Sequence, residues 1–346
     1  MMEALLEINW LYLVLTAFAG GAFGAAIGAL PAFVFTGIMV IAGEAGGLSG
    51  VTGQVAFGSF FGPHIAFGGG VAASAYAAKK GYMDSGFEFH ESKNIGYALG
   101  PKVDVMAVGG LFGIVGALIT TLSSSFGLPW DPIAIAVVLS ALLHRVVLGY
   151  SILGPAEGGR LDMSPFTEEQ KRTHDAGVVS DMVKDATDRL VVEPWLPHQY
   201  QWAQVAGIGF VGGLLGAFAA VETGSAFLAF GISAASLLFL NLGVVRFPVT
   251  HHITLPASTV ALAVIASGEG VQEAILTGGS DVTAILIGGL LGLICALFGE
   301  WFQRIFYAHG DTHVDPPAAA ITFGTFLIAV LYGIGLLGTT VWIPLP

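Results

Sequence analysis

Three histidines in two apolar segments are the strongest candidates for chemistry in this sequence. His64 follows Pro63 in FGSFFGPHIAFGGG, and His251 and His252 lie between two prolines in FPVTHHITLPAS. A neutral imidazole donates and accepts hydrogen bonds at once, is protonated near neutral pH and ligates metals. We therefore expect these rings to contact a solute or an ion. The alternative is a structural role, in which each ring bonds a nearby backbone carbonyl.

The prolines beside these histidines predict broken helices. Proline removes a backbone donor and clashes with the preceding turn, and lipid offers no partner for the carbonyl that this frees. Broken helices at corresponding places in two halves of a chain mark a transport site. Because His64 corresponds to His252, and His251 only to Pro63, the pair His64 and His252 is the sharper prediction. The predicted pathway residues are His64, His251, His252, Pro63, Gly68, Gly69, Gly70, Thr250, Thr254 and Ser258.

Three acids are further candidates. Asp131 and Asp315 each precede a proline at the start of an apolar segment. This pattern favours helix capping and leaves open a gating or ion-attracting role. Glu222 lies near the end of another apolar segment, where it is either a coupling-ion or proton site or a solvated carboxylate.

The stretch HGDTHVD is a candidate metal site. His309, Asp311 and His313 alternate there, so on an extended backbone they would share one face, and imidazole with carboxylate suits zinc or another divalent ion. The stretch is also a predicted loop in which Asp315 caps the next helix. Metal binding is therefore an alternative to a structural role for this loop.

The elements that must position these residues are transmembrane helices. The chain has 346 residues, is 55% hydrophobic and 10% charged, and has a mean hydropathy of +0.80, which is outside the balance of soluble proteins. This predicts an all-α integral membrane protein, and the 50 glycines favour close helix packing. The single cysteine excludes a disulfide within the chain. The net charge of −12 argues against a nucleic-acid partner.

Ten apolar segments are long enough to be considered as membrane spans, which need roughly 20 residues each. The segments are 9–28, 30–43, 55–78, 103–126, 132–153, 204–221, 225–243, 247–267, 282–306 and 317–338. They divide into a first membrane repeat, 1–153, and a second, 204–346, separated by a polar connector, 154–203. The sequence leaves open whether 9–43 forms one span or two.

Four short matches recur in the same order in both halves and predict an internal repeat. AGGAFGAAIGALPAFVFTG (19–37) resembles VGGLLGAFAAVETGSAFLAFG (211–231), PHIAFGGG (63–70) resembles HHITLPAS (251–258), VGGLFGIVGAL (108–118) resembles IGGLLGLICAL (287–297), and WDPIAIAV (130–137) resembles VDPPAAAI (314–321). Five spans per unit is an odd number, so the second unit starts on the opposite side of the membrane. The predicted repeats are therefore inverted.

The distribution of basic residues predicts the orientation. A cytoplasmic connector puts all 12 Lys and Arg in inner loops or near the inner ends of helices, as the positive-inside rule requires. The N- and C-termini then lie outside. The outer segments carry several acids, which would either concentrate cations or reflect an acidic surface on both sides.

This plan of two inverted five-helix units resembles that of urea channels and ammonium channels. LPAST (255–259) is similar to a urea-channel motif, although Val260 and Ala261 replace the proline and aromatic residue that should follow, and FGGGV (67–71) lacks the motif. In ammonium channels a symmetric pair of histidines lines the pore. The resemblance implies a pathway between the two repeats.

We therefore expect a channel or secondary transporter for a small solute in the cell membrane, and not an enzyme. Few ionised groups lie in the spans, which favours a neutral or weakly basic solute. The expected partners are the solute and lipid, with self-association into a homo-oligomer and no cofactor. One alternative is a permease-like subunit of a larger complex. The other is a membrane-embedded metal site, for divalent-metal transport or catalysis, built on the three histidines and an acid.

Overall fold

The computed structural model describes residues 9–156, 158–172, 189–267 and 280–345, which form helices and connecting segments without a β-strand. Five of these helices are long and apolar enough to cross a membrane. They are α2 (Trp10–Ile27), α5 (Val103–Ser125), α8 (Trp202–Thr223), α13 (Ser280–Phe306) and α14 (Pro316–Gly333). Their length and composition identify a membrane-embedded helical protein.

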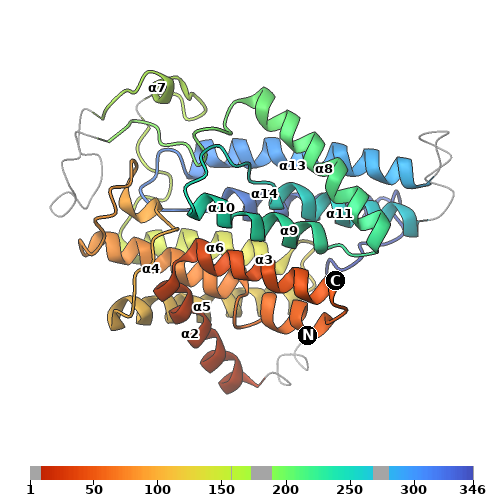
Figure 1. Cartoon of the computed structure of the whole chain (residues 1–346), viewed down its shortest axis with the longest axis horizontal. Helices are drawn as coiled ribbons and strands as arrows, with labels where there is room; N and C mark the ends of the chain where they lie inside the picture. Colours follow the sequence, from red (N-terminus) through yellow and green to blue (C-terminus); the bar gives the residue numbers. More distant parts are fainter. Residues whose placement is uncertain (1–8, 157, 173–188, 268–279, 346) are drawn as a thin grey trace.

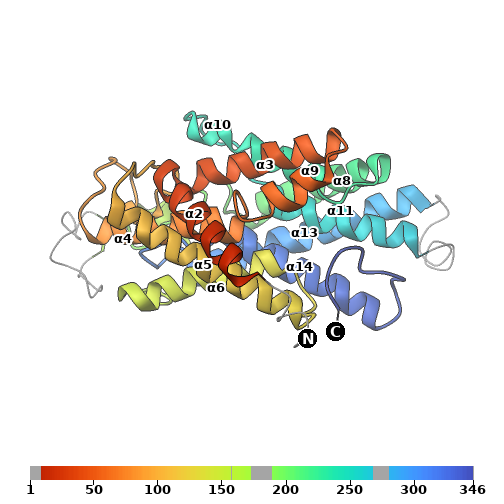
Figure 2. The ribbon, with the colours of Figure 1, turned by 90° about the horizontal axis from the view of Figure 1, so that it is seen from below.

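Shorter helices complete the bundle. They are α3 (Ala29–Ala45), η1 (Val51–Ala56), η2 (Pro63–Phe67), α4 (Gly68–Lys79), η3 (Glu91–Lys93), α6 (Pro132–Leu148), α7 (Ser164–Thr167), α9 (Leu228–Ser236), α10 (Leu238–Asn241) and α11 (His251–Ala266). Most of the longer helices run roughly along the long axis of the molecule, whereas α2 and α8 cross it obliquely on opposite sides of the bundle (Figure 1). Figure 2 shows the same bundle from below, with α5 and α6 side by side.

The stretch 9–43, which the sequence left open, forms two helices. The break lies at Gly28, whose φ of 96° ends α2, and this left-handed conformation is accessible to glycine at little cost. Pro31 falls in the first turn of α3. A missing backbone donor is tolerated there because the first amides of a helix have no partner within it.

The two histidine segments differ in where the helix is interrupted. In the first, η1 ends at Ala56 and a new helix begins at Pro63, continuing from η2 into α4. In the second, residues 247–250 are irregular and α11 begins at His251. The helix runs through Pro256 without interruption, so the break expected at that proline is absent. Both segments thus contain a helix that starts at the corresponding positions Pro63 and His251.

Corresponding glycines make corresponding contacts in the two halves of the chain. A methyl group on Gly20 would meet a side-chain carbon of Ile65 at 3.0 Å, and one on Gly212 would meet the same atom of Ile253 at 3.2 Å. These isoleucines follow His64 and His252. Two further contacts also have a counterpart in the other half. The contact of Gly21 with Gly109 corresponds to that of Gly213 with Gly288, and the contact of Gly24 with Ala66 corresponds to that of Gly216 with Thr254. The small residues bring α2 close to α5 and to the 63–79 helix, and α8 close to α13 and α11.

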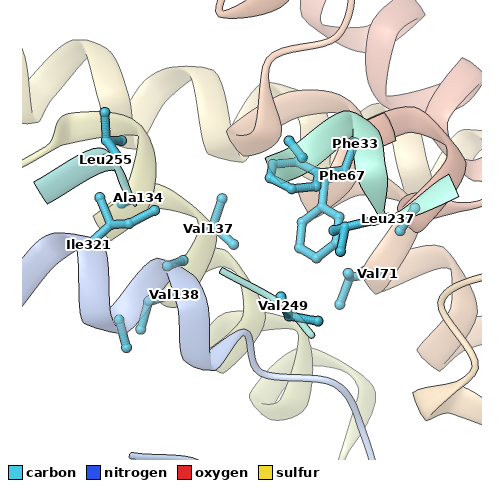
Figure 3. Close-up of a cluster of buried hydrophobic side chains, with 14 of the residues drawn as sticks. Phe33, Phe67, Val71, Ala134, Val137, Val138, Leu237, Val249, Leu255 and Ile321 are labelled. Carbon is cyan, nitrogen blue, oxygen red and sulfur yellow. The ribbon is translucent and has the colours of Figure 1, made fainter. Parts of the chain in front are cut away.

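The largest apolar core lies between the two halves. It includes Phe33 and Val137 from the first half with Leu255 and Ile321 from the second, on helices α3, α6, α11 and α14 (Figure 3). Smaller clusters lie within the first half, around Ala73 between α2 and α5, and within the second half, around Val260. The halves therefore meet through a shared core.

Gly116 of α5 tests this packing, because a methyl group there would collide with the carbonyl oxygen of His64. We expect Gly116→Ala to destabilise the fold by roughly 1–3 kcal/mol, the usual cost of overpacking. A methyl group on Gly207 of α8 would meet no described residue outside its own helix within 4 Å, so Gly207→Ala should be neutral or stabilising by up to about 1 kcal/mol, since alanine is the better helix former. Unfolding of both variants in mixed detergent measures the difference, and equal effects would contradict this packing.

Candidate functional site

A cavity of about 540 Å³ lies between the two halves of the chain. Five of the sequence-predicted residues line it, namely Pro63, Asp131, His251, His313 and Asp315. Four of these residues mark the starts of helices, since Pro63 and His251 begin η2 and α11, and Asp131 and Asp315 cap α6 and α14. Two helix starts from each half therefore converge on this one cavity.

His64 and His252 are buried, at 5% and 3% exposed, but neither lines the cavity. The His252 ring instead meets the Trp195 ring at 5.9 Å between centroids. Successive side chains of a helix point about 100° apart. In helices that start at Pro63 and His251, the first residue of each pair faces the cavity and the second turns away.

His251 has the environment of a binding group. Its ring centroid lies 4.8 Å from that of Phe33 and 6.0 Å from that of Phe230, and its side chain is 5% exposed. Its Nδ1 atom has no hydrogen-bond partner among the described residues, and the side chain of Thr250, the residue before α11, makes no capping hydrogen bond. An imidazole and the first amides of a helix are therefore presented together at the cavity wall.

Asp131 and Asp315 line the cavity at the starts of α6 and α14. One oxygen of Asp131 accepts hydrogen bonds from the amides of Ile133 and Ala134, and Asp315 accepts one from Ala318. The amide of Asp131 donates to Thr325 Oγ1 at 2.9 Å. Because α6 and α14 pack side by side and Thr325 lies well along α14 from Asp315, the two acids are separated by about 15 Å of helix.

Near the connector, the cavity is bordered by a buried ion pair. Lys93 Nζ lies 2.7 Å from Glu193 Oε2, with both side chains fully buried, and 4.6 Å from the centre of the Tyr307 ring. Burial lowers the pKa of Lys93 to about 8, although the charge of Glu193 opposes the shift. Burial alone would raise the pKa of Glu193, but the positive charges of Lys93 and Arg189 outweigh it and hold that pKa below its ordinary value.

The HGDTHVD loop does not bring its candidate metal ligands together. The His309 ring contacts the carbonyl of Arg160, Asp311 pairs with Arg189 at 2.8 Å, and His313 lies 3.0 Å from Asp315. Each of the three side chains thus has a different partner. Within the described ranges, no group of three or more His, Cys, Asp or Glu side chains could hold a metal ion.

The remaining predicted residues pack or cap rather than line the cavity. Ser258 Oγ donates to the carbonyl of Gly216 at 2.8 Å, Thr250 and Ser233 share a hydrogen bond of 2.7 Å between hydroxyls, and Glu222 is exposed at the end of α8. The predicted residues outside the cavity wall are His64, His252, Gly68, Gly69, Gly70, Thr250, Thr254, Ser258, Glu222, His309 and Asp311.

Sequence reasoning missed the aromatic character of the cavity. Nine aromatic side chains line it: Phe33, Phe57, Phe67, Phe87, Trp195, Phe227, Phe230, Tyr307 and Trp342. One signal was available, because Phe33 and Phe227 occupy corresponding positions in the repeat and both line the cavity. Trp195 and Glu193 come from the connector, so part of this polar segment is buried against the bundle.

Comparison with known proteins identifies a family. A family model described as "Family of unknown function (DUF7973)" matches residues 2–346. No curated protein and no solved structure matches the chain.

The Lys93–Glu193 pair yields a prediction about stability. Glu193→Gln leaves the buried ammonium of Lys93 without a counter-charge, whereas Arg189, which also pairs with Glu193, keeps Asp311. The single variant should cost about 3–5 kcal/mol, and the double variant Lys93→Met/Glu193→Gln should recover most of that loss. In the native chain the pair's contribution should fade as pH drops below about 4.5, because the folded pKa of Glu193 lies below its ordinary value.

Unfolding in detergent as a function of pH measures both effects. Glu168→Gln is the control, since it removes the same charge from an exposed position. Equal stability of Glu193→Gln and Glu168→Gln would contradict a structural role for the buried pair.

Proposed function

We propose that this chain, which belongs to the DUF7973 family, is a membrane transporter or channel that moves a small solute through the cavity between its two halves. The observation that carries the proposal is the convergence of four helix starts, two from each half, on a single cavity of about 540 Å³. Helices that begin inside a membrane protein present polar backbone to a solute where lipid cannot.

The proposed architecture is a pair of inverted repeats, each with five membrane spans. The matching glycine contacts support it, and so does the contact between Gly37 of α3 and Gly231 of α9. These two residues occupy corresponding positions, and a methyl group on Gly231 would lie 3.2 Å from the carbonyl oxygen of Gly37. Corresponding residues touch each other where a two-fold axis passes between them. Such an axis in the membrane plane relates inverted repeats.

The proposed orientation puts the connector in the cytoplasm and the termini outside. Basic side chains gather at the connector end, where Arg145 donates to the carbonyl of Phe306 and Arg304 to that of Tyr200. At the other end, Glu44 accepts hydrogen bonds from Thr52 and Ser225. This separation of charge agrees with the positive-inside rule.

A bulky side chain inside the cavity tests the transport proposal. Ile321 lines the cavity and is 5% exposed, whereas Phe326 on the same helix faces outward at 39%. Ile321→Trp should reduce solute flux into liposomes at least tenfold because it fills the pathway, and Phe326→Trp should leave flux unchanged. The measurement is a screen of radiolabelled amines, amides and carboxylates. Unaltered flux in a folded Ile321→Trp protein would contradict this pathway.

Cysteine labelling tests the orientation. The single native cysteine, Cys295, is buried, so an impermeant maleimide should report on introduced sites. Leu48 and Val245 are exposed, at 57% and 82%. Val245 lies beside the connector residues Tyr200 and Gln201, and Leu48 follows the end of α3, on the side that the proposal puts outside. Leu48→Cys should react on intact cells and Val245→Cys only after permeabilisation. The reverse pattern would invert the orientation, and reaction of both on intact cells would contradict the proposed spans.

A further inference from the structure

We infer that the solute is a hydrophobic organic cation, an amine or quaternary ammonium with an aromatic or aliphatic body, whose charged group binds near Asp131. This inference deepens the proposed function and depends on it for the role of the cavity. It is drawn from the size of the cavity, the rings that line it and the balance of charges in its wall.

The size of the cavity favours an organic solute over a small inorganic one. Its volume of about 540 Å³ falls within the range of roughly 300–1,000 Å³ found for pockets that bind organic ligands. Ammonium or urea would fill a small part of this space. A solute that displaces the water from it needs an apolar body that matches the apolar wall.

The aromatic rings form a continuous series along the cavity. Neighbouring ring centroids in the series lie between 5.3 and 5.8 Å apart. In order, the rings belong to Phe67, Phe33, Phe230, Phe57, Phe227 and Trp342. Aromatic rings provide apolar area and attract cations through their π faces, so the series suits a hydrophobic solute that carries positive charge.

The charges in the cavity wall leave an acid without a counter-charge. Lys93 is paired with Glu193, and Asp315 contacts His313 and caps α14. Asp131 forms no ion pair with any described residue. One of its oxygens receives both capping hydrogen bonds, and the other receives none from the described residues. That second oxygen is available to an ammonium group.

The uncapped starts of η2 and α11 favour an anion instead. Each helix N-terminus carries the equivalent of about half a positive charge, but Pro63 gives η2 no amide hydrogen at its first position, and these partial charges are spread over two helix starts, whereas Asp131 carries a full charge on one carboxylate. The His251 ring at the start of α11 bears an unpartnered Nδ1, and a neutral imidazole accepts a hydrogen bond from an amine as readily as it donates one. The balance of the wall therefore favours the cation.

Three probes of similar size and shape test the charge preference. Phenylbutylamine, phenylbutanol and phenylbutyrate carry a positive, a neutral and a negative head on the same body. Calorimetry on the purified full chain should show the amine binding at least tenfold more tightly than the carboxylate. Tighter binding of phenylbutyrate, or no binding of the amine, would overturn the inference.

The variant Asp131→Asn removes the charge and keeps a residue that caps helices well. It should weaken amine binding at least tenfold and leave phenylbutanol binding unchanged. Asp162→Asn is the matched control, because Asp162 accepts hydrogen bonds from Ser164 in the connector, away from the cavity. Full retention of amine affinity in a folded Asp131→Asn protein would contradict the assignment.

The two proposals fail in different ways. If the amine binds and Asp131→Asn weakens it, but no solute crosses liposomes, the solute class stands and transport is wrong. If a carboxylate or an uncharged solute crosses and Ile321→Trp blocks it, transport stands and the solute class is wrong.

Discussion

A helix that starts inside an apolar bundle leaves its first amide groups without partners, and this constraint shapes the centre of the molecule. Lipid and apolar side chains cannot satisfy those groups. Asp131 and Asp315 satisfy the first amides of α6 and α14, but the residues before η2 and α11 make no side-chain capping hydrogen bond. The uncapped starts therefore lie at a cavity, where water or a solute can reach them.

The cavity exists because the two halves meet across small residues at some places and large rings at others. Gly37 and Gly231 allow α3 and α9 to pack closely. Phe33 and Phe227 occupy corresponding positions beside that contact, and both line the cavity. Close packing at the glycines fixes the distance between the halves, and the rings then set the width of the space that remains.

Hydropathy located the apolar segments, because lipid requires continuous apolar runs wherever a helix crosses, and five of the ten expected spans are helices long and apolar enough to do so. The same reasoning located both histidine segments but not the residue that faces the cavity. His251 lines it and His252 does not, and this depends on the residue at which α11 begins. A one-residue change in the start of a helix rotates every later side chain by about 100°, and the prolines alone do not define that start.

The connector was predicted as a polar segment outside the bundle, and its composition could not reveal which of its residues are buried. Glu193 is matched by Lys93, a residue far from it in the chain, and a pairing of that kind leaves no pattern in a single sequence. Trp195 and Leu196, which follow Glu193 in the chain, line the cavity together with Lys93. The connector thus contributes Glu193, which pairs with Lys93 in the cavity wall. Asp131, which also lines the cavity, forms no ion pair with any described residue. If the halves are inverted repeats, the Lys93–Glu193 pair at one place in the wall is a departure from their symmetry.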